Sequence, residues 1–431
     1  MKEYTMKNAV KWSSVALAVA LGNGLIASQA LAQTTERAEG IVEGATATLS
    51  NRTMYFSRDF RSPGDRQSKR EEAATGFVLD FASGFSEGPI GLGFDVTAMS
   101  GIKLDSSPDR ANTGILPVDE DGSAPNEYSE IRGAVKANIL TDTTLRYGVH
   151  FPENPVIAYD DARLLPSHYS GYSVTNESIE GLFVEAGRMN SRGDMASSSQ
   201  GDDEGVFRFS EENDKVIYLG GTYTLNDALA ATLYTSKADE LWKRHFAGLS
   251  HTAALSDVFS LTTELAHYQT SDEDGGVNYD NKASSLGLTL GAGNHGFTLA
   301  YQHMGGDTGY LYEDGAIFLA NSVQYADFNA KDERSYQARY DYDFAGLGLP
   351  GLTFMTRYIT SDNIDAAHEG LADESRDGRW ERDTNISYTV QNGSLEGVNV
   401  LWRNATVRQD EAFDGDIDEN RLIVSYSWDL L

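Results

Sequence analysis

The sequence predicts an all-β protein, a transmembrane antiparallel β-barrel of the bacterial outer membrane with long outer loops partly folded into the lumen. From residue 45 onward, apolar and polar residues alternate with the period of two that is typical of strands. Short turns between these runs interleave with long, acidic segments. A secretory leader precedes the first run, and no later stretch approaches the roughly 18 apolar residues of a membrane helix.

Composition argues against several other classes. The 431 residues contain no cysteine, which excludes a disulfide scaffold and a thiolate metal site. Acidic residues number 65 against 34 lysines and arginines, and the formal net charge of -31 argues against nucleic acid as the main partner. Aromatic residues make up 10% of the chain, which argues against a disordered protein.

Residues 1–32 have the layout of a signal peptide. Three lysines precede an apolar run over residues 15–21, and the segment closes on Ala30-Leu31-Ala32, an A-x-A pattern. This apolar run is shorter than the roughly 20 residues that span a bilayer, which disfavours a membrane anchor. We expect cleavage after Ala32, export, and a barrel formed by residues 33–431.

The predicted strands follow in order along the chain. Residues 73–85 and 90–97 alternate on either side of a Ser86-Glu87-Gly88-Pro89 turn, which predicts a β-hairpin. The same pattern recurs near residues 130–150, 214–237, 241–271, 281–304, 334–360, 380–408 and 419–430. We count roughly 17 strands near the length that spans a membrane, and because single-chain barrels have even strand numbers, we expect that one is miscounted.

The connections differ in length in a way that favours a membrane barrel. The long segments lie near residues 103–129, 151–180, 189–213, 305–332, 361–379 and 409–418, and they hold most of the acidic residues. Outer-membrane barrels have short periplasmic turns opposite long outer loops. A soluble secreted β-protein, the alternative, does not require this asymmetry.

Alternation directs the basic side chains of the strands toward the lumen. Where Tyr336, Ala338 and Tyr340 face lipid, Arg339 between them faces inward. The same reasoning gives nine inward basic residues: Arg52, Arg58, Arg132, Lys136, Arg146, Arg339, Arg357, Arg403 and Arg421.

Two interpretations of these basic residues remain open. We favour a ladder of guanidinium groups that passes anions along the wall, because arginine grips carboxylates and stays charged when partly desolvated. In the alternative, the inward charge is balanced locally by Asp80, Asp95, Glu130, Asp341 and Asp383. In either case, exclusion from lipid explains why these side chains point inward, since a lipid-facing arginine costs roughly 2–4 kcal/mol at the bilayer midplane.

Several segments, in order from about residue 45 to the C-terminus, resemble the OprD family of substrate-specific outer-membrane porins. They include Arg52-Thr-Met-Tyr-Phe-Ser-Arg-Asp-Phe, Thr113-Gly-Ile-Leu-Pro-Val-Asp, Gly305-Gly-Asp-Thr-Gly, Ile317-Phe-Leu-Ala-Asn-Ser-Val-Gln-Tyr and Pro350-Gly-Leu-Thr-Phe-Met-Thr-Arg-Tyr. The resemblance implies an 18-stranded barrel, an eyelet narrowed by infolded loops, and small carboxylates, including amino acids and aromatic acids, as substrates.

The resemblance also implies positions for the constriction. Carried onto this sequence, its loops are 151–180 and 305–332, with these residues: His150, Asp160, Asp161, Arg163, Asn321, Ser322 and Tyr325. Asp160 and Asp161 would hold an ammonium group, and Tyr325 would stack on an aromatic ring. The family often has two alternating arginines on the strand before the last. Here the pair reads Leu401 and Arg403, which favours a less polar or aromatic carboxylate.

Catalytic and cofactor motifs are weak, and we expect no enzyme, cofactor or metal. Residues 291–296 match G-x-G-x-x-G, but a strand pattern follows where the fingerprint needs a helix, so we expect a hairpin turn. The expected partners are small carboxylate or amino-acid solutes, outer-membrane lipid and lipopolysaccharide, with the chain a monomer or weak homotrimer. Two alternatives stay open: a channel for basic amino acids and, from a different class, an outer-membrane barrel enzyme.

Overall fold

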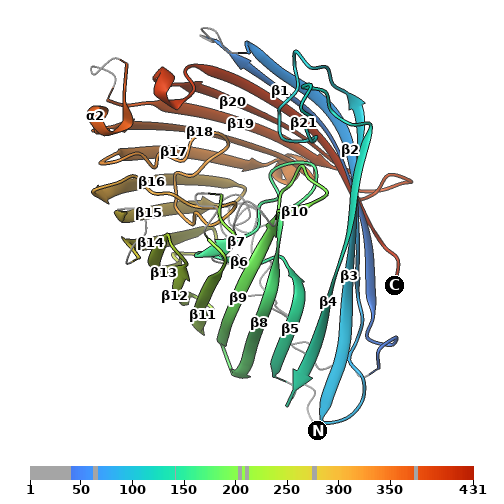
Figure 1. The fold of residues 1–431 in the computed structure, drawn as a ribbon. Coiled ribbons are helices and arrows are strands. Elements are labelled where there is room, and N and C mark those ends of the chain that lie inside the picture. Colours follow the sequence, from blue (N-terminus) through green and yellow to red (C-terminus); the bar gives the residue numbers. More distant parts are fainter. Residues whose placement is uncertain are drawn as a thin grey trace.

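The computed structural model describes residues 40–61, 67–140, 142–201, 206–208, 213–273, 279–372 and 377–431. One antiparallel sheet of 19 strands closes on itself, because β1 pairs with both β2 and β21. One of its strands, β10 (Gln200–Gly201), has two residues, so 18 long strands form the barrel wall of Figure 1.

The long strands are, in order, β1 (Thr46–Phe60), β2 (Lys69–Ala82), β3 (Ile90–Asp105), β4 (Glu127–Ile139), β5 (Thr143–His150), β8 (His168–Ile179), β9 (Leu182–Gly193), β11 (Val216–Asn226), β12 (Leu229–Ala238), β13 (Trp242–Ala254), β14 (Phe259–Asp272), β15 (Asp280–Ala292), β16 (His295–Gly306), β17 (Arg334–Asp343), β18 (Leu352–Asp362), β19 (Trp380–Thr389), β20 (Asn399–Arg408) and β21 (Ile417–Asp429). Within the described residues, no helix is long and apolar enough to cross a membrane.

The expected fold class is confirmed, and the barrel has the 18 strands that the resemblance implied, one more than the roughly 17 counted from alternation. The missing strand is β8, which lies inside the segment 151–180 that we expected to be a single infolded loop. Apart from Tyr172 and Val174, its residues around Ser170, Gly171 and Ser173 are small or polar, so the strand gives only a weak hydrophobic alternation. The loop therefore spans only residues 151–167, and the segment expected at 189–213 begins after β9 ends at Gly193.

Side chains alternate between lipid and lumen as the pattern predicted. On β17, Tyr336 is 45% exposed, whereas the alternate residues Gln337 and Arg339 are 3% and 7% exposed. The turn at Gly293–Asn294 joins β15 and β16 as a hairpin, so the G-x-G-x-x-G match lies at a turn and opens no helix.

The lumen holds its own packed core. Segments of the loops 151–167 and 307–333 fold inward and bury apolar side chains, including Val156, Ile157 and Phe318, against inward aromatic residues of the wall such as Tyr268 on β14. Loop 151–167 contains a small hairpin of β6 (Glu153–Asn154) and β7 (Ile157–Ala158). A second apolar cluster seats Leu164 and its neighbours on the inner face of β1 to β4.

Candidate substrate pathway

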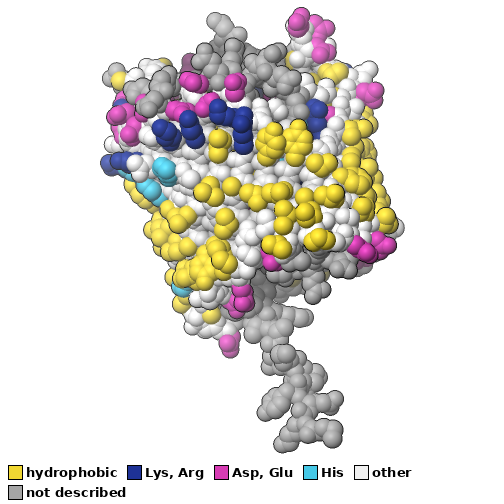
Figure 2. Space-filling view, turned by 60° about the horizontal axis from the view of Figure 1, so that its bottom comes forward, with side chains coloured by type: hydrophobic (Ala, Val, Ile, Leu, Met, Phe, Trp, Pro, Cys, Tyr) yellow, Lys and Arg dark blue, Asp and Glu magenta, His cyan; other side chains and the backbone are white. Residues whose placement is uncertain are grey.

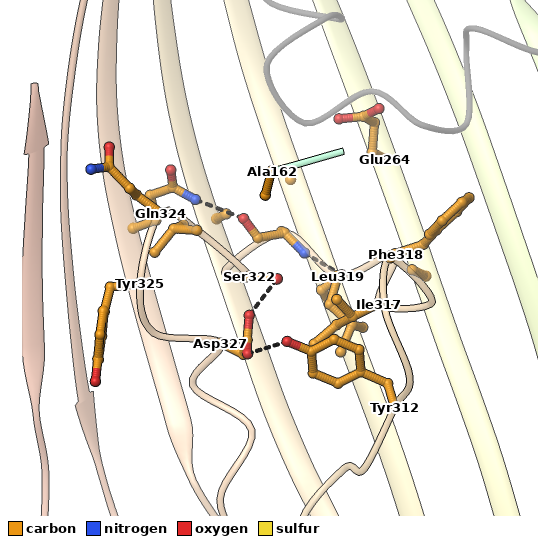
Figure 3. A pocket seen from close by; sticks show the side chains of 18 of the residues that line it. Ala162, Glu264, Tyr312, Ile317, Phe318, Leu319, Ser322, Gln324, Tyr325 and Asp327 are labelled. Atoms are coloured by element: carbon orange, nitrogen blue, oxygen red, sulfur yellow. Dashed lines mark hydrogen bonds between the residues drawn. The ribbon is translucent and has the colours of Figure 1, made fainter. Parts of the chain in front are cut away.

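The infolded loops leave a cavity of about 550 Å³ within the barrel. Arg163 of the first loop lines it, together with Ser322, Tyr325 and Asp327 of the second, while Glu264 on β14 comes from the barrel wall. In Figure 3, Tyr325 and Glu264 lie at opposite sides of this space. A path through the barrel therefore passes between loop side chains and the strand wall.

One buried carboxylate ties the two loops to the wall. Asp314 in loop 307–333 accepts two hydrogen bonds of 2.8 Å from the guanidinium of Arg192 on β9. It also accepts hydrogen bonds of 2.9 Å each from the hydroxyls of Ser167, at the end of the first loop, and Tyr169 on β8. Arg192 and Asp314 have side chains only 5% and 1% exposed. We call Asp314, Arg192, Ser167 and Tyr169 the loop latch.

Other anchors fix the tip of the second loop. The carboxylate of Glu381 on β19 accepts the backbone N–H groups of Tyr325 and Ala326, at 2.9 and 2.7 Å. Asn321 donates to the hydroxyl of Ser335 and accepts from the amide of Gln337, both at 2.9 Å. These bonds hold the loop against β17 and β19.

Eight of the nine predicted basic residues pair with a carboxylate. All of these pairs are short, between 2.5 and 2.7 Å, and they join Arg52 to Asp161, Arg58 and Arg421 to Glu419, Arg132 to Glu130, Lys136 and Arg146 to Asp95, Arg339 to Asp341, and Arg357 to Asp383. Asp80, which we considered as another balancing acid, accepts a hydrogen bond from Thr97 at 2.7 Å. Much of the inward charge is therefore neutralised locally.

Arg403 is the exception among the nine. It is half-buried on β20, directly across the sheet from Arg421, and among the described residues it makes no ion pair or hydrogen bond. Arg163 in the first loop likewise has no carboxylate partner in the described part of the chain. Its Nε donates to the carbonyl of Thr113 at 3.2 Å, and its guanidinium lies over the ring of Phe56.

Arg163 lies near two other arginines. Burial, with Arg421 and Arg58 nearby, lowers the pKa of Arg163 to about 10. The group still carries its positive charge at neutral pH. A guanidinium that makes no ion pair with a carboxylate of the described residues is suited to receive an anion from solution.

The structure corrects several of the expected constriction residues. His150 is the last residue of β5 and lies in the wall, where its two ring nitrogens contact the carbonyl of Gly148 and the hydroxyl of Ser173. Asn321 is fully buried as a loop anchor and does not line the cavity. Asp161 forms an ion pair with Arg52, but its side chain is 43% exposed, so the binding of an ammonium group there stays a prediction.

The remaining expected residues do line the cavity. Asp160 accepts the backbone N–H of Ala162 at 2.7 Å, and Ser322 donates to Asp327 at 2.6 Å. Tyr325 already has a cation over its ring, since Arg58 lies 4.7 Å from the ring centre. A substrate ring that stacks on Tyr325 must share it with this guanidinium.

Sequence reasoning missed the wall acid Glu264 and the loop latch. Glu264 faces the cavity and makes no hydrogen bond or ion pair among the described residues. Its inward position follows from alternation, since Leu265 beside it is exposed at 42%, so the sequence carried a usable signal for it.

A pH dependence follows from the cavity acids. Burial raises the pKa of Asp160 and of Asp327. A raised pKa means that these carboxyls lose their negative charge early as the pH falls. As the pH falls from neutral into the acidic range, we therefore expect the lumen to become more anion-selective, measured as the reversal potential in a salt gradient. The Asp160→Asn, Asp327→Asn double variant should show a smaller shift, whereas a shift toward cation selectivity in the parent channel would contradict the assignment.

A closed barrel of 18 strands, with infolded loops that narrow a charged lumen, defines a porin of the outer membrane. Residues 39–430 match the model of the outer membrane porins of the OprD family, and the chain belongs to that family, as the resemblance implied. It is therefore a channel and not an enzyme.

Relatives agree over nearly the whole chain. Porin D of Pseudomonas aeruginosa is 35% identical over 462 residues, which cover 98% of this chain and 99% of the relative. The crystal structure of OccK9 (OpdG) from the same organism is 37% identical with a TM-score of 0.84, covering 91% of this chain and all of that one. The crystal structure of P. aeruginosa OpdK with vanillate is 31% identical with a TM-score of 0.80, covering 90% of this chain and all of that one.

Proposed function

We propose that this porin takes up small carboxylates passively, aromatic acids or amino acids among them. The observation that carries the proposal is a pair of cations, Arg403 on the wall and Arg163 in the loop, that have no carboxylate partner among the residues the structure describes. The eight paired basic residues supply a polar wall, while these two offer guanidinium groups to a solute carboxylate. Of the nine basic residues that the sequence predicted as a ladder, Arg403 thus has no carboxylate partner among the described residues.

The shape of the cavity supports substrates with an apolar part. Ile317, Phe318 and Leu319 line it beside Tyr325, so a carboxylate with a ring or an aliphatic chain finds apolar contacts there. The related OpdK was solved with vanillate, an aromatic carboxylate, which points the same way.

Uptake of basic amino acids is the second candidate. Glu264 and Asp160 on the cavity wall favour it, because carboxylates opposite a guanidinium suit a solute that carries both charges. A competition experiment in planar bilayers separates the two functions. If the first proposal holds, benzoate lowers the chloride current at concentrations where arginine has little effect. The reverse order of potency would support basic amino acids and overturn the proposal.

The N-terminal segment remains a prediction, since residues 1–39 lie outside the described residues. We propose that residues 1–32 are a signal peptide cleaved after Ala32. N-terminal sequencing of the protein purified from outer membranes should begin at Gln33, and a retained Met1 would refute the cleavage. A monomer or weak homotrimer also stays a prediction.

A further inference from the structure

A row of basic side chains lies on the outer wall of the barrel and faces away from the lumen. We call the following exposed residues, which lie on β9, β13, β15, β17 and β19, the outer basic row: Arg188, Lys243, Lys282, Arg334 and Arg382. They point away from the lumen, because their neighbours along the strands, such as Arg244 and Ser335, are buried. Figure 2 shows lysine and arginine side chains in a row between a wide apolar band and the acidic side chains at the rim.

Members of this row have no carboxylate partner among the described residues. Arg188 donates to the side chain of Asn190 at 2.8 Å, and Arg382 donates to the hydroxyl of Thr406 at 3.1 Å. Lys237, a nearby outward lysine, differs because it is paired with Asp239 and Glu273. In a chain with a net charge of -31, the row is therefore a localised positive surface.

The depth of the row indicates which leaflet it faces. A lysine or arginine on the lipid face costs roughly 2–4 kcal/mol at the midplane and about 0–1 kcal/mol near an interface, so the row marks an interface. Exposed leucines such as Leu249 and Leu265 lie on the side toward the short turns, and the described residues of those turns contain no lysine or arginine. Within the described part of the chain, the row therefore lies at the end with the long loops, which faces the outer leaflet.

A groove of about 440 Å³ opens on the same wall next to Lys243. His245, two residues from Lys243 on β13, lines its polar side with His267 and Gln269, whereas the exposed Leu219 and Leu233 line its apolar side. Small residues make room for it, since Gly220 and Ala247 are part of its lining. A groove that is polar toward the cations and apolar toward the membrane suits an amphiphile with an anionic head.

We propose that the outer basic row and this groove bind lipopolysaccharide, the phosphorylated glycolipid of the outer leaflet. Its phosphate groups pair with Lys243, Lys282 and Arg334, because lysine and arginine bind phosphate through charge-assisted hydrogen bonds. One of its acyl chains lies against the leucines of the groove. Lipid binding here is independent of which solute the lumen carries.

The test compares lipid retention by detergent-purified protein in native mass spectrometry. We expect the full chain to retain lipopolysaccharide in preference to the same lipid after enzymatic removal of its phosphates. The Lys243→Gln, Lys282→Gln, Arg334→Gln triple variant should bind lipopolysaccharide about 10- to 100-fold more weakly, since each basic side chain near an anionic surface contributes severalfold.

Matched controls show that the effect belongs to the row. Lys69→Gln removes a lysine of β2 whose side chain is 44% exposed and paired with Glu71, and it should leave lipid retention unchanged. Single-channel conductance should be the same for all three proteins, which shows that the triple variant folds. Equal retention by the parent and the triple variant, or no preference for the phosphorylated lipid, would overturn the proposal. So would loss of self-association in the triple variant without a change in lipid retention, because the row would then contact a second copy of the chain.

Discussion

Replacement of Asp314 by alanine is expected to widen the channel and abolish its selectivity. The change removes the acceptor that Arg192, Ser167 and Tyr169 share, and it leaves the buried Arg192 without its bidentate partner. Breaking a buried ion pair costs roughly 3–5 kcal/mol. A cost of about 3 kcal/mol changes the ratio of docked to undocked loop by about 150-fold, so the two infolded loops should leave the eyelet for much of the time.

Single-channel recording checks this prediction, with a larger and noisier conductance as the expected result. Asp194→Asn is the matched control. Asp194 also contacts Arg192, but its side chain is 38% exposed, so its loss should have little effect. An Asp314→Ala channel with the conductance and selectivity of the parent would show that the loop latch does not hold the constriction.

The second large effect is expected from Arg403→Gln, which should reduce carboxylate flux by about 10- to 100-fold. A hydrogen bond to a charged group contributes roughly 1.5–3 kcal/mol, and every 1.4 kcal/mol is a factor of about ten. The fold should not suffer, because Arg403 lies across from Arg421 and their like charges repel each other. Flux of a neutral solute of the same size should stay within about twofold, since the pore keeps its width.

Arg382→Gln provides the matched control for Arg403→Gln. Arg382 is an arginine on the neighbouring strand β19 that faces lipid, so its loss should leave carboxylate flux unchanged. If Arg403→Gln and Arg382→Gln transport carboxylates equally well, the unpaired inward guanidinium has no part in permeation.

The strands were predictable because the membrane imposes a strict alternation. Apolar residues such as Ile131 and Val135 alternate with inward polar groups, and the lipid face tolerates few exceptions. The failure at β8 has the same cause, since its mostly small and polar residues give little contrast between the faces. Inward direction was therefore predictable wherever a large apolar residue stood next to a charged one.

The pairing of the inward charges was only partly predictable. Glu130 and Arg132, Arg339 and Asp341, and Glu419 and Arg421 are each two residues apart on one strand, so they share a face and pair locally. The two-residue spacing alone therefore predicted that each of these arginines is neutralised by the carboxylate next to it on the same face.

The loop latch, in contrast, joins residues far apart in the sequence. Asp314 and Arg192 are 122 positions apart, and their contact depends on how two loops fold into the lumen. The alternation of residues along a strand cannot predict a contact between distant loops. For the same reason, the burial of Asn321 and the pairing of Asp161 were also missed.

The central claim, that the lumen selects small carboxylates, is tested most directly by liposome swelling with solutes matched in size. Benzoate and its neutral counterpart benzyl alcohol differ chiefly in the carboxylate. We predict that liposomes containing the channel swell faster in benzoate, and that Arg403→Gln removes this advantage. Equal swelling in the two solutes, or faster swelling in benzyl alcohol, would contradict the account.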